Sequence, residues 1–194
     1  MTPTRDRIVA AAEQVIQELG LARATTKEIA RAAGCSEALL YKHFRTKEEI
    51  FLAVLLERMP ALRPATQRLG ERVGQGTVAG NLEELAWAAV EFFRRTISLA
   101  GGMLSDPSLL NGFRQTLAES GGGPHVPIDL VASYLREEQR IGRVGPDANP
   151  DAASALLFGA CFHRAFLANL VELAPDEVLV PDLVRTLLAG LTPR

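Results

Sequence analysis

Apolar side chains recur at helical spacing through the first twenty residues of the chain. Between residues 4 and 19 they follow the i, i+3, i+4, i+7 pattern, which places them on one face of an amphipathic helix. Gly20 comes next, where a left-handed C-terminal cap is needed. The pattern predicts a helix over residues 4–19 whose inner face consists of Ile8, Ala11, Ala12, Val15, Ile16 and Leu19.

Polar residues divide the following thirty positions into short helices. Thr25, with a glutamate three positions later, forms a capping box that opens a second helix. Gly34 interrupts the pattern, Ser36 can cap a third helix, and Thr46 begins another capping box that opens a fourth. Two short helices joined by a tight turn are helix-turn-helix geometry, in which the second helix can enter the major groove of DNA.

The third helix, within the stretch "GCSEALLYKHF", carries an apolar face and a mixed face. Leu40 and Phe44 are four positions apart, so on a helix they stack and can be buried together. Leu39 and Tyr41 fall beside a lysine and a histidine on the remaining surface, and this combination is unusual for a face that is only solvated. The helix therefore either closes a small core or also contacts a partner.

Beyond residue 58 the hydrophobic pattern remains helical, and Pro- and Gly-rich segments separate the helices. The segment at about 151–172 is apolar all round, so it must be buried on every side, and in a small domain one side can face a second copy of the chain. The last predicted helix, from Pro181 to Leu191, can pair with it in a four-helix interface. The other helices expected here run from Asn81 to Leu99, from Asp106 through Leu117, and from Leu130 to Ile141.

The composition favours an all-α fold, and the net charge gives no indication of a polyanionic partner. The 194 residues are 47% hydrophobic but only 6% aromatic, and the prominence of Ala and Leu favours helices over sheet. The net charge is −2, and residues 1–58 carry nine Lys and Arg against eight Asp and Glu. Binding to DNA would therefore depend on the local placement of cations.

Several classes of function lack a signature in the sequence. Cys35 and Cys161 lie far apart in apolar helical patterns, and we expect two reduced thiols. The three histidines are distant from one another, so we expect no metal and no cofactor. There is no P-loop, GxSxG, HExxH or nucleophile–base pair, so we expect no catalytic residues and no enzyme.

A membrane location is also not expected. The N-terminus acquires charges at once and lacks the apolar core of a signal peptide. The most apolar run, residues 152–162, is shorter than the roughly 20 residues that a membrane span requires. These features predict a soluble, cytoplasmic protein without a membrane partner.

The stretch "TTKEIARAAGCSEALLYKHFRTKEEIFLAVL" resembles the DNA-binding segment of the TetR-type (tetracycline-repressor-like) transcriptional regulators. It departs from the family pattern at Cys35, where a small aliphatic residue is usual, and at Leu39, where Thr or another small residue is common. The match runs from about residue 5 to residue 56. The counterparts of the family motif are Ile8 to Ala12, Thr26, Ile29, Ala30, Ala33, Gly34, Ser36, Leu40, Tyr41, His43, Phe44, Lys47 and Glu48.

The resemblance implies a homodimeric regulator of double-stranded operator DNA. It implies an N-terminal three-helix helix-turn-helix domain, residues 1–48, and a C-terminal helical bundle, residues 49–194, for effector binding and dimerisation. Repression that ends when a small molecule binds is what is usual in the family. The alternative is a helical protein-interaction module that merely resembles a DNA binder. The negative net charge of the whole chain favours this alternative.

Nine residues are candidates for contact with DNA. Thr26 at a helix start, the hydroxyl of Tyr41 and the two lysines suit phosphates, although capping, core-edge and solvated roles are their alternatives. The start of the third helix would face base edges, where a glutamate can accept a hydrogen bond from cytosine and apolar groups can contact thymine. The phosphate candidates are Thr26, Tyr41, Lys42, His43 and Lys47, and the base candidates are Ser36, Glu37, Ala38 and Leu39.

An effector pocket is implied by the resemblance more than by the residues themselves. The large apolar side chains of the second domain can line a cavity or simply fill the core. Few polar side chains accompany them, which favours a largely apolar effector of aromatic or acyl-chain character. The candidates are Trp87, Phe93, Met103, Phe113, Tyr134 and Phe162.

Overall fold

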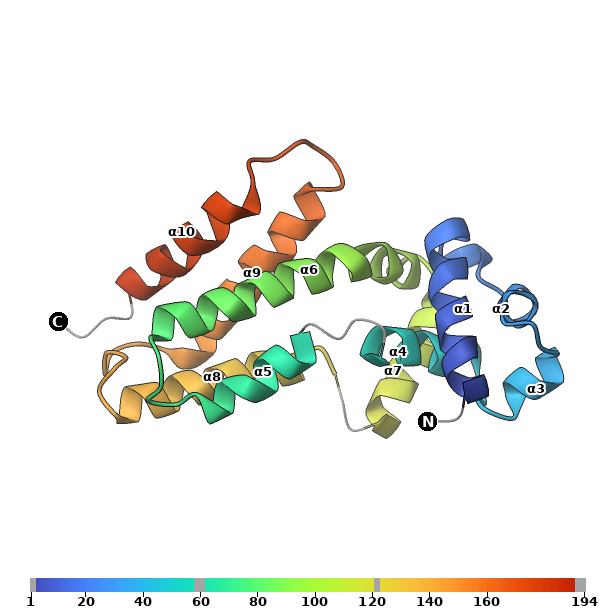
Figure 1. The fold of residues 1–194 in the computed structure, drawn as a ribbon, viewed down its shortest axis with the longest axis horizontal. Coiled ribbons are helices and arrows are strands. Elements are labelled where there is room, and N and C mark those ends of the chain that lie inside the picture. The colour runs from blue at the N-terminus through green and yellow to red at the C-terminus, as the bar shows by residue number, and fades with distance from the viewer. Residues whose placement is uncertain (1–2, 58–61, 121–122, 191–194) are drawn as a thin grey trace. The chain divides into compact units, whose positions relative to one another are not determined.

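The computed structural model describes residues 3–57, 62–120 and 123–190. Over these ranges the protein is built from α-helices and one short 3-10 helix, without a strand (Figure 1). The predicted all-α class is confirmed. By packing, the chain divides into two compact units, Met1–Pro60 with Arg95–Gly123 and Ala61–Arg94 with Pro124–Arg194, and the division falls within the long helix α6 (Val78–Leu104).

The first unit is formed around one apolar core. Helix α1 packs against α2 and α4, and α4 in turn packs against α7. The buried side chains include Ile8, Ile29, Leu40 and Phe51, one from each of the four N-terminal α-helices, and Phe44 from the segment between the third and the fourth. Besides the end of α6, the elements of this unit are α1 (Pro3–Leu19), η1 (Leu21–Arg23), α2 (Thr26–Ala32), α3 (Glu37–Tyr41), α4 (Lys47–Glu57) and α7 (Pro107–Ser120).

Helix α6 extends beyond its predicted end at Leu99, through two glycines to Leu104. A close approach that the local sequence does not reveal accounts for the second glycine. A Cβ atom on Gly102 would lie 2.7 Å from the Cβ of Leu21, so this turn of the helix passes η1 at a distance that only glycine permits. The following helix starts as predicted, because a carboxylate oxygen of Asp106 accepts hydrogen bonds from the backbone N–H groups of Ser108 and Leu109.

The second unit is a helical bundle with its own core. Helix α8 packs against both α5 and α9, and α9 packs against α10 (Figure 1). The core is mainly aliphatic, with Leu82, Leu85, Leu135 and Leu157 fully buried, together with Tyr134. Its elements are α5 (Leu62–Glu71), the first part of α6, α8 (His125–Arg140), α9 (Pro150–Leu167) and α10 (Asp176–Ala189).

The start of α6 differs from the prediction, which made Asn81 the N-terminal cap. The helix begins at Val78, and the hydroxyl of Thr77 accepts a hydrogen bond from the N–H of Gly80 at 3.0 Å. Asn81 is buried inside the first turn, where its amide donates to the carbonyl of Gln75 at 3.0 Å and to the hydroxyl of Tyr134 at 2.9 Å. Its role is to join α6 to α8.

The same part of the bundle contains a buried carboxylate. Glu138 on α8 is fully buried, and its Oε1 accepts a hydrogen bond from the N–H of Gly74 at 3.1 Å. Its Oε2 lies 3.2 Å from Nε of Arg143, whose guanidinium also donates to the carbonyl of Gly76 at 2.8 Å. These contacts fasten the loop between α5 and α6 to α8.

Helix α10 starts five residues before the predicted Pro181, which lies inside the helix. A buried ion pair secures the earlier start. Nε of Arg164 on α9 donates to Oδ1 of Asp176, the first residue of α10, at 2.7 Å, and Arg94 on α6 pairs with the other carboxylate oxygen. Arg164 also donates to the carbonyl of Ala174, so it holds the segment between α9 and α10 in place.

Candidate DNA-binding site

The two short helices α2 and α3 begin with the caps that the sequence predicts. The hydroxyl of Thr25 accepts a hydrogen bond from the N–H of Glu28, and that of Ser36 accepts one from the N–H of Leu39, both at 3.2 Å. Each bond gives a side-chain acceptor to a backbone donor in the first turn of a helix, and the N–H of Leu39 also donates to the carbonyl of Ser36 at 3.0 Å. The sequence "T-x-x-E" and the serine after the turn thus fix where both helices start.

Gly34 makes the turn between α2 and α3. Its φ of +61° lies in the left-handed region that glycine adopts without strain, and the N–H of Cys35 donates back to the carbonyl of Ala30 at 2.9 Å. This bond closes the C-terminal end of α2 and reverses the chain within a few residues. The turn orients α3 across α2, as helix-turn-helix geometry requires.

Helix α3 has one buried side and one exposed side. Leu40 is buried in the core of the first unit, as predicted, and so is Phe44, which follows the end of the helix at Tyr41; both fix the position of α3. Tyr41, between them in sequence, is 50% exposed. Of the nine predicted contact residues, Ser36, Glu37, Ala38, Tyr41 and Lys42 are exposed, and Thr26, Leu39, His43 and Lys47 are half-buried.

Hydrogen bonds connect three of these nine residues across α2 and α3. Oγ1 of Thr26 donates to Oε2 of Glu37 at 2.9 Å, and the hydroxyl of Tyr41 donates to Oγ1 of Thr26 at 3.4 Å. The carboxylate therefore lies on the same exposed surface as the two hydroxyls. Lys47 begins α4, where its ammonium lies 5.3 Å from the centre of the Phe51 ring.

Arg45, in the segment between α3 and α4, was not among the predicted contact residues. Its guanidinium pairs with Glu49 at 2.6 Å and with Glu119 on α7 at 3.1 Å. The hydrogen bond to Glu49 is the main reason that the pKa of Arg45 is raised, and Glu119 adds to the shift. The partner on α7 is 74 positions away, so no local pattern reveals this contact.

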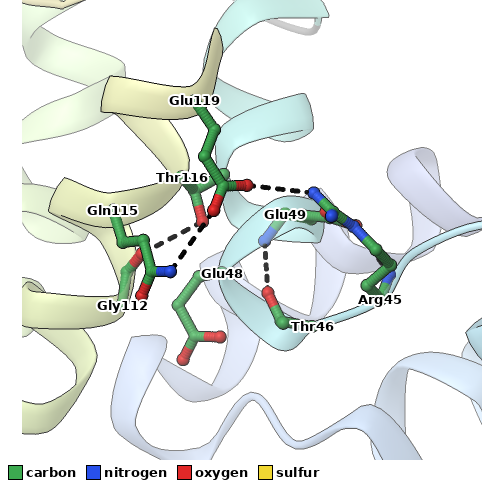
Figure 2. A pocket seen from close by; sticks show the side chains of 8 residues that line it. All are labelled: Arg45, Thr46, Glu48, Glu49, Gly112, Gln115, Thr116 and Glu119. Carbon is green, nitrogen blue, oxygen red and sulfur yellow. Dashed lines mark hydrogen bonds and ion pairs between the residues drawn. The ribbon is translucent and has the colours of Figure 1, made fainter.

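A pocket of about 240 Å³ lies beside this arginine, between α4 and α7 (Figure 2). The two helices approach closely because Gly112 has no side chain, and a Cβ there would lie 2.8 Å from Cγ of Glu48. The lining is polar and includes three glutamates, so it does not resemble the apolar effector pocket that was expected. Its residues are Arg45, Thr46, Glu48, Glu49, Gly112, Gln115, Thr116 and Glu119.

The helix-turn-helix segment matches a known family model, that of the bacterial regulatory proteins of the tetR family, over residues 8–54. The similarity to curated regulators extends over nearly the whole chain. The HTH-type transcriptional regulator UidR of Escherichia coli (strain K12) is 29% identical over 97% of this chain and 93% of its own. These matches support a TetR-type transcriptional regulator.

Two further proteins support the TetR assignment at the level of sequence and of fold. The uncharacterized HTH-type transcriptional regulator YvkB of Bacillus subtilis (strain 168) is 23% identical over 99% of both chains. The crystal structure of a TetR-family regulator from Mesorhizobium loti MAFF303099 covers 99% of this chain and all of its own, with a TM-score of 0.76 and 20% identity. The protein is thus a DNA-binding regulator with a TetR fold.

The six residues expected to line an effector pocket fall into two groups in this TetR-type structure. Met103 and Phe113 belong to the core of the first unit. In the second unit, the ring of Phe93 meets that of Phe162 edge-on, with 5.4 Å between ring centres. Tyr134 is buried in the aliphatic core and Trp87 is partly exposed. The second group therefore lies in the second unit and consists of Trp87, Phe93, Tyr134 and Phe162.

The remaining expectations concern thiols, metals and membranes. Both cysteines are free, with Cys161 buried and Cys35 half-buried, as expected for reduced thiols. Burial raises the pKa of the Cys161 thiol to about 12. Within residues 3–57, 62–120 and 123–190, no group of three or more His, Cys, Asp and Glu side chains could hold a metal ion, and none of the helices has the length and apolarity to cross a membrane.

Proposed function

We propose that this regulator is a homodimeric repressor that leaves its operator when a small, largely apolar effector binds. Residues 1–48 contact DNA, and residues 49–194 bind the effector and the second subunit. As a regulator of chromosomal genes it acts in the cytoplasm. The observation that carries the DNA-contact surface is the two-sided segment of α3 and the three residues after it, in which Leu40 and Phe44 are buried while Tyr41 and Lys42 remain exposed.

Phosphate contacts supply much of the affinity in this proposal. The start of α3 presents no Arg, Asn or Gln, which make the commonest strong contacts to guanine and adenine. Ser36, Ala38 and Leu39 offer a hydroxyl and apolar surface to base edges, and Glu37 offers an acceptor. Contacts to the backbone come from Thr26, Tyr41, Lys42, His43 and Lys47.

Fluorescence anisotropy with a duplex from the gene's own upstream region tests this assignment. A dimer with roughly 6–10 phosphate contacts loses about 10³–10⁵ in affinity between 50 and 200 mM salt. Lys42→Ala weakens binding and flattens the salt dependence, whereas Arg140→Ala on α8 removes the same charge outside the proposed DNA and dimer surfaces and leaves both unchanged. Salt-independent binding contradicts the proposal, and failure to bind any duplex would leave the interaction-module alternative.

A second copy of the chain covers the exposed side of α9. This helix was predicted to be apolar all round, and one side of it is indeed unburied in the single chain, with Leu156 65% exposed. Such a stripe suits a two-fold interface in which α9 and α10 of both subunits form four helices. The stripe consists of Ala152, Ala155, Leu156, Gly159, Phe162 and Phe166.

Light scattering after size-exclusion chromatography tests the dimer. Leu156→Glu places a charge in the stripe, and we expect it to yield monomers at concentrations at which the wild type is dimeric. Leu130→Glu on α8 is the matched control, because Leu130 is an exposed leucine outside the stripe. A monomeric wild type, or a dimer that Leu156→Glu does not weaken, contradicts this part of the proposal.

An aromatic group in the second unit is the basis for the apolar effector. Phe93 packs edge-on against Phe92, Phe158 and Phe162, with ring centres 5.4 to 6.4 Å apart. An aromatic or acyl-chain compound can pack against these rings in place of a neighbouring ring, so that one apolar contact replaces another. A thermal-shift screen checks this, and stabilisation by highly charged ligands alone would contradict it.

Release from the operator requires that the effector bind one conformation more tightly than another. A coupling of about 1–3 kcal/mol between effector and DNA is typical of allosteric proteins. Helix α4 is the proposed lever, because the short "RTK" segment connects it to the DNA-reading helices. An effector that binds without changing operator affinity would contradict this mechanism, and a reporter gene that falls silent on deletion of the regulator would indicate an activator.

A further inference from the structure

Glu37 is the sole carboxylate among the nine proposed DNA-contact residues, and it lies on the surface that meets a polyanion. It accepts a hydrogen bond from Thr26, which in turn accepts one from Tyr41, at the distances given above. Within the described part of the chain, no Lys or Arg nitrogen lies within 4 Å of this carboxylate. Its charge is therefore not neutralised by a close cation.

In the free protein, both hydroxyls donate their protons to other side chains. A threonine or tyrosine hydroxyl has one proton to donate. The proton of Thr26 points to Glu37, and the proton of Tyr41 points to Thr26. A DNA phosphate oxygen can only accept hydrogen bonds, so it can bind these hydroxyls only after one of the two internal bonds is broken.

We propose that Glu37 is a specificity-determining residue that competes with DNA phosphates for the hydroxyl of Thr26. In the free protein, its carboxylate accepts the hydrogen bond from Thr26 that a phosphate oxygen would accept in the complex. Its negative charge also repels any duplex. Phosphate contacts are the same at every sequence, whereas base contacts exist only at the operator. Glu37 therefore reduces binding to arbitrary DNA more than binding to the operator. This inference rests on the proposed contact surface, but it replaces the base-reading role given to Glu37 above with competition for Thr26.

Substitutions at Glu37 and Thr26 in the full-length protein test the competition. Glu37→Gln removes the charge but keeps an oxygen that can accept from Thr26, and Glu37→Ala removes both. Glu18→Gln is the matched control, because Glu18 is an exposed carboxylate of α1 outside the contact set. The probes are a 30-base-pair duplex of scrambled sequence and a duplex from the gene's own upstream region, each measured by fluorescence anisotropy over a range of salt.

We expect Glu37→Gln and Glu37→Ala to strengthen binding to the scrambled duplex by about three- to eightfold at 0.1 M salt. The upper value corresponds to a salt slope steeper by about 0.9, the effect of one additional neutralised phosphate. Binding to the upstream duplex strengthens less, so the ratio of the two affinities falls. Glu18→Gln changes either affinity by less than about twofold, because its charge lies outside the surface.

Thr26→Val separates competition for the hydroxyl from simple repulsion. In this background the hydroxyl is absent, and the gain from Glu37→Gln falls to less than half of its value in the wild type. An equal gain in both backgrounds overturns the proposal, because it assigns the whole effect to charge. Glu37→Gln that weakens only binding to the upstream duplex also overturns it, because Glu37 then reads a base.

The lysine variants distinguish failure of this inference from failure of the contact surface. If Lys42→Ala and Lys47→Ala weaken binding to both duplexes while substitutions of Glu37 have no effect, the surface stands and the role of Glu37 is wrong. If neither lysine variant changes binding, the surface itself is wrong and the inference fails with it.

Discussion

The chain's two tyrosines show how differently the two compact units use polar side chains. Tyr41 on α3 is 50% exposed, and its hydroxyl makes one long hydrogen bond of 3.4 Å to Thr26. Tyr134 on α8 is 1% exposed, and its hydroxyl accepts a hydrogen bond of 2.9 Å from the buried amide of Asn81. The first hydroxyl can exchange its partner for a ligand, whereas the second is committed to the fold.

The same contrast holds for charges. Beside the proposed DNA surface, Arg45 pairs with Glu49 and Glu119 at positions open to water. In the second unit, Arg164 and Asp176 pair with each other, and their side chains are only 10% and 7% exposed. Exposed pairs contribute little to stability, whereas breaking a buried pair leaves an uncompensated charge. Substitutions of polar residues in the second unit should therefore affect folding, and those on α2 and α3 should affect binding.

The largest effect is expected from Asp176→Ala. This change leaves the guanidinium of Arg164 buried without its partner, and such a loss costs about 3–5 kcal/mol of unfolding free energy. Asp182→Ala is the matched control on the same helix, since Asp182 is exposed and pairs with Arg185 at 2.5 Å. The control should cost about 1 kcal/mol or less. Equal losses in urea unfolding would show that the Arg164 pair is no more important than a surface pair.

The two tyrosines provide the next comparison. Tyr134→Phe leaves the amide of Asn81 with one hydrogen-bond partner fewer inside the core, at a cost of about 1–3 kcal/mol. Tyr41→Phe should change the unfolding free energy by less than about 0.5 kcal/mol, because the hydroxyl is exposed to water. Urea titrations of both variants check this. A Tyr41 variant as unstable as the Tyr134 variant would contradict the distinction between the two units.

Alkaline pH should weaken the second unit through the same hydroxyl. Burial is the main reason that the pKa of Tyr134 is raised from 10.0 to about 12. A raised pKa means that the neutral form stabilises the fold below pH 10, and that this contribution is lost as the pH rises from 10 to about 12. The wild type should lose about 1.4 kcal/mol relative to Tyr134→Phe by about pH 11. An unchanged difference between the two proteins from pH 8 to 11 would contradict this.

Local signals in the sequence predicted the helix-turn-helix almost completely. The caps at Thr25 and Ser36, the turn at Gly34 and the buried pair Leu40 and Phe44 each involve residues within four positions of one another. The family resemblance rests on the same residues. The exposed side of α3 follows from them, because burial of one face leaves the other outside.

Features that depend on distant residues could not be predicted. Asn81 has the sequence of an N-terminal cap, but its side chain bonds to Tyr134, 53 positions away. Helix α6 continues past Gly102, where Leu21 approaches it closely, and the start of α10 at Asp176 is held by Arg164. The bond between Thr26 and Glu37 is of the same kind, since it depends on how α2 and α3 cross.

The smallest effect on the unfolding free energy is expected from the N-terminal cap of α3, which lies within the proposed DNA surface. Ser36→Ala removes the side-chain acceptor for the N–H of Leu39, which should cost about 1 kcal/mol of unfolding free energy, whereas Ser36→Gly should cost a few tenths. Ser36 also lies on the proposed base-reading surface, so both variants lose the same hydroxyl toward DNA. If the cap alone matters, only the alanine variant weakens binding to the upstream duplex. Equal weakening by both substitutions would instead show that the hydroxyl of Ser36 contacts DNA.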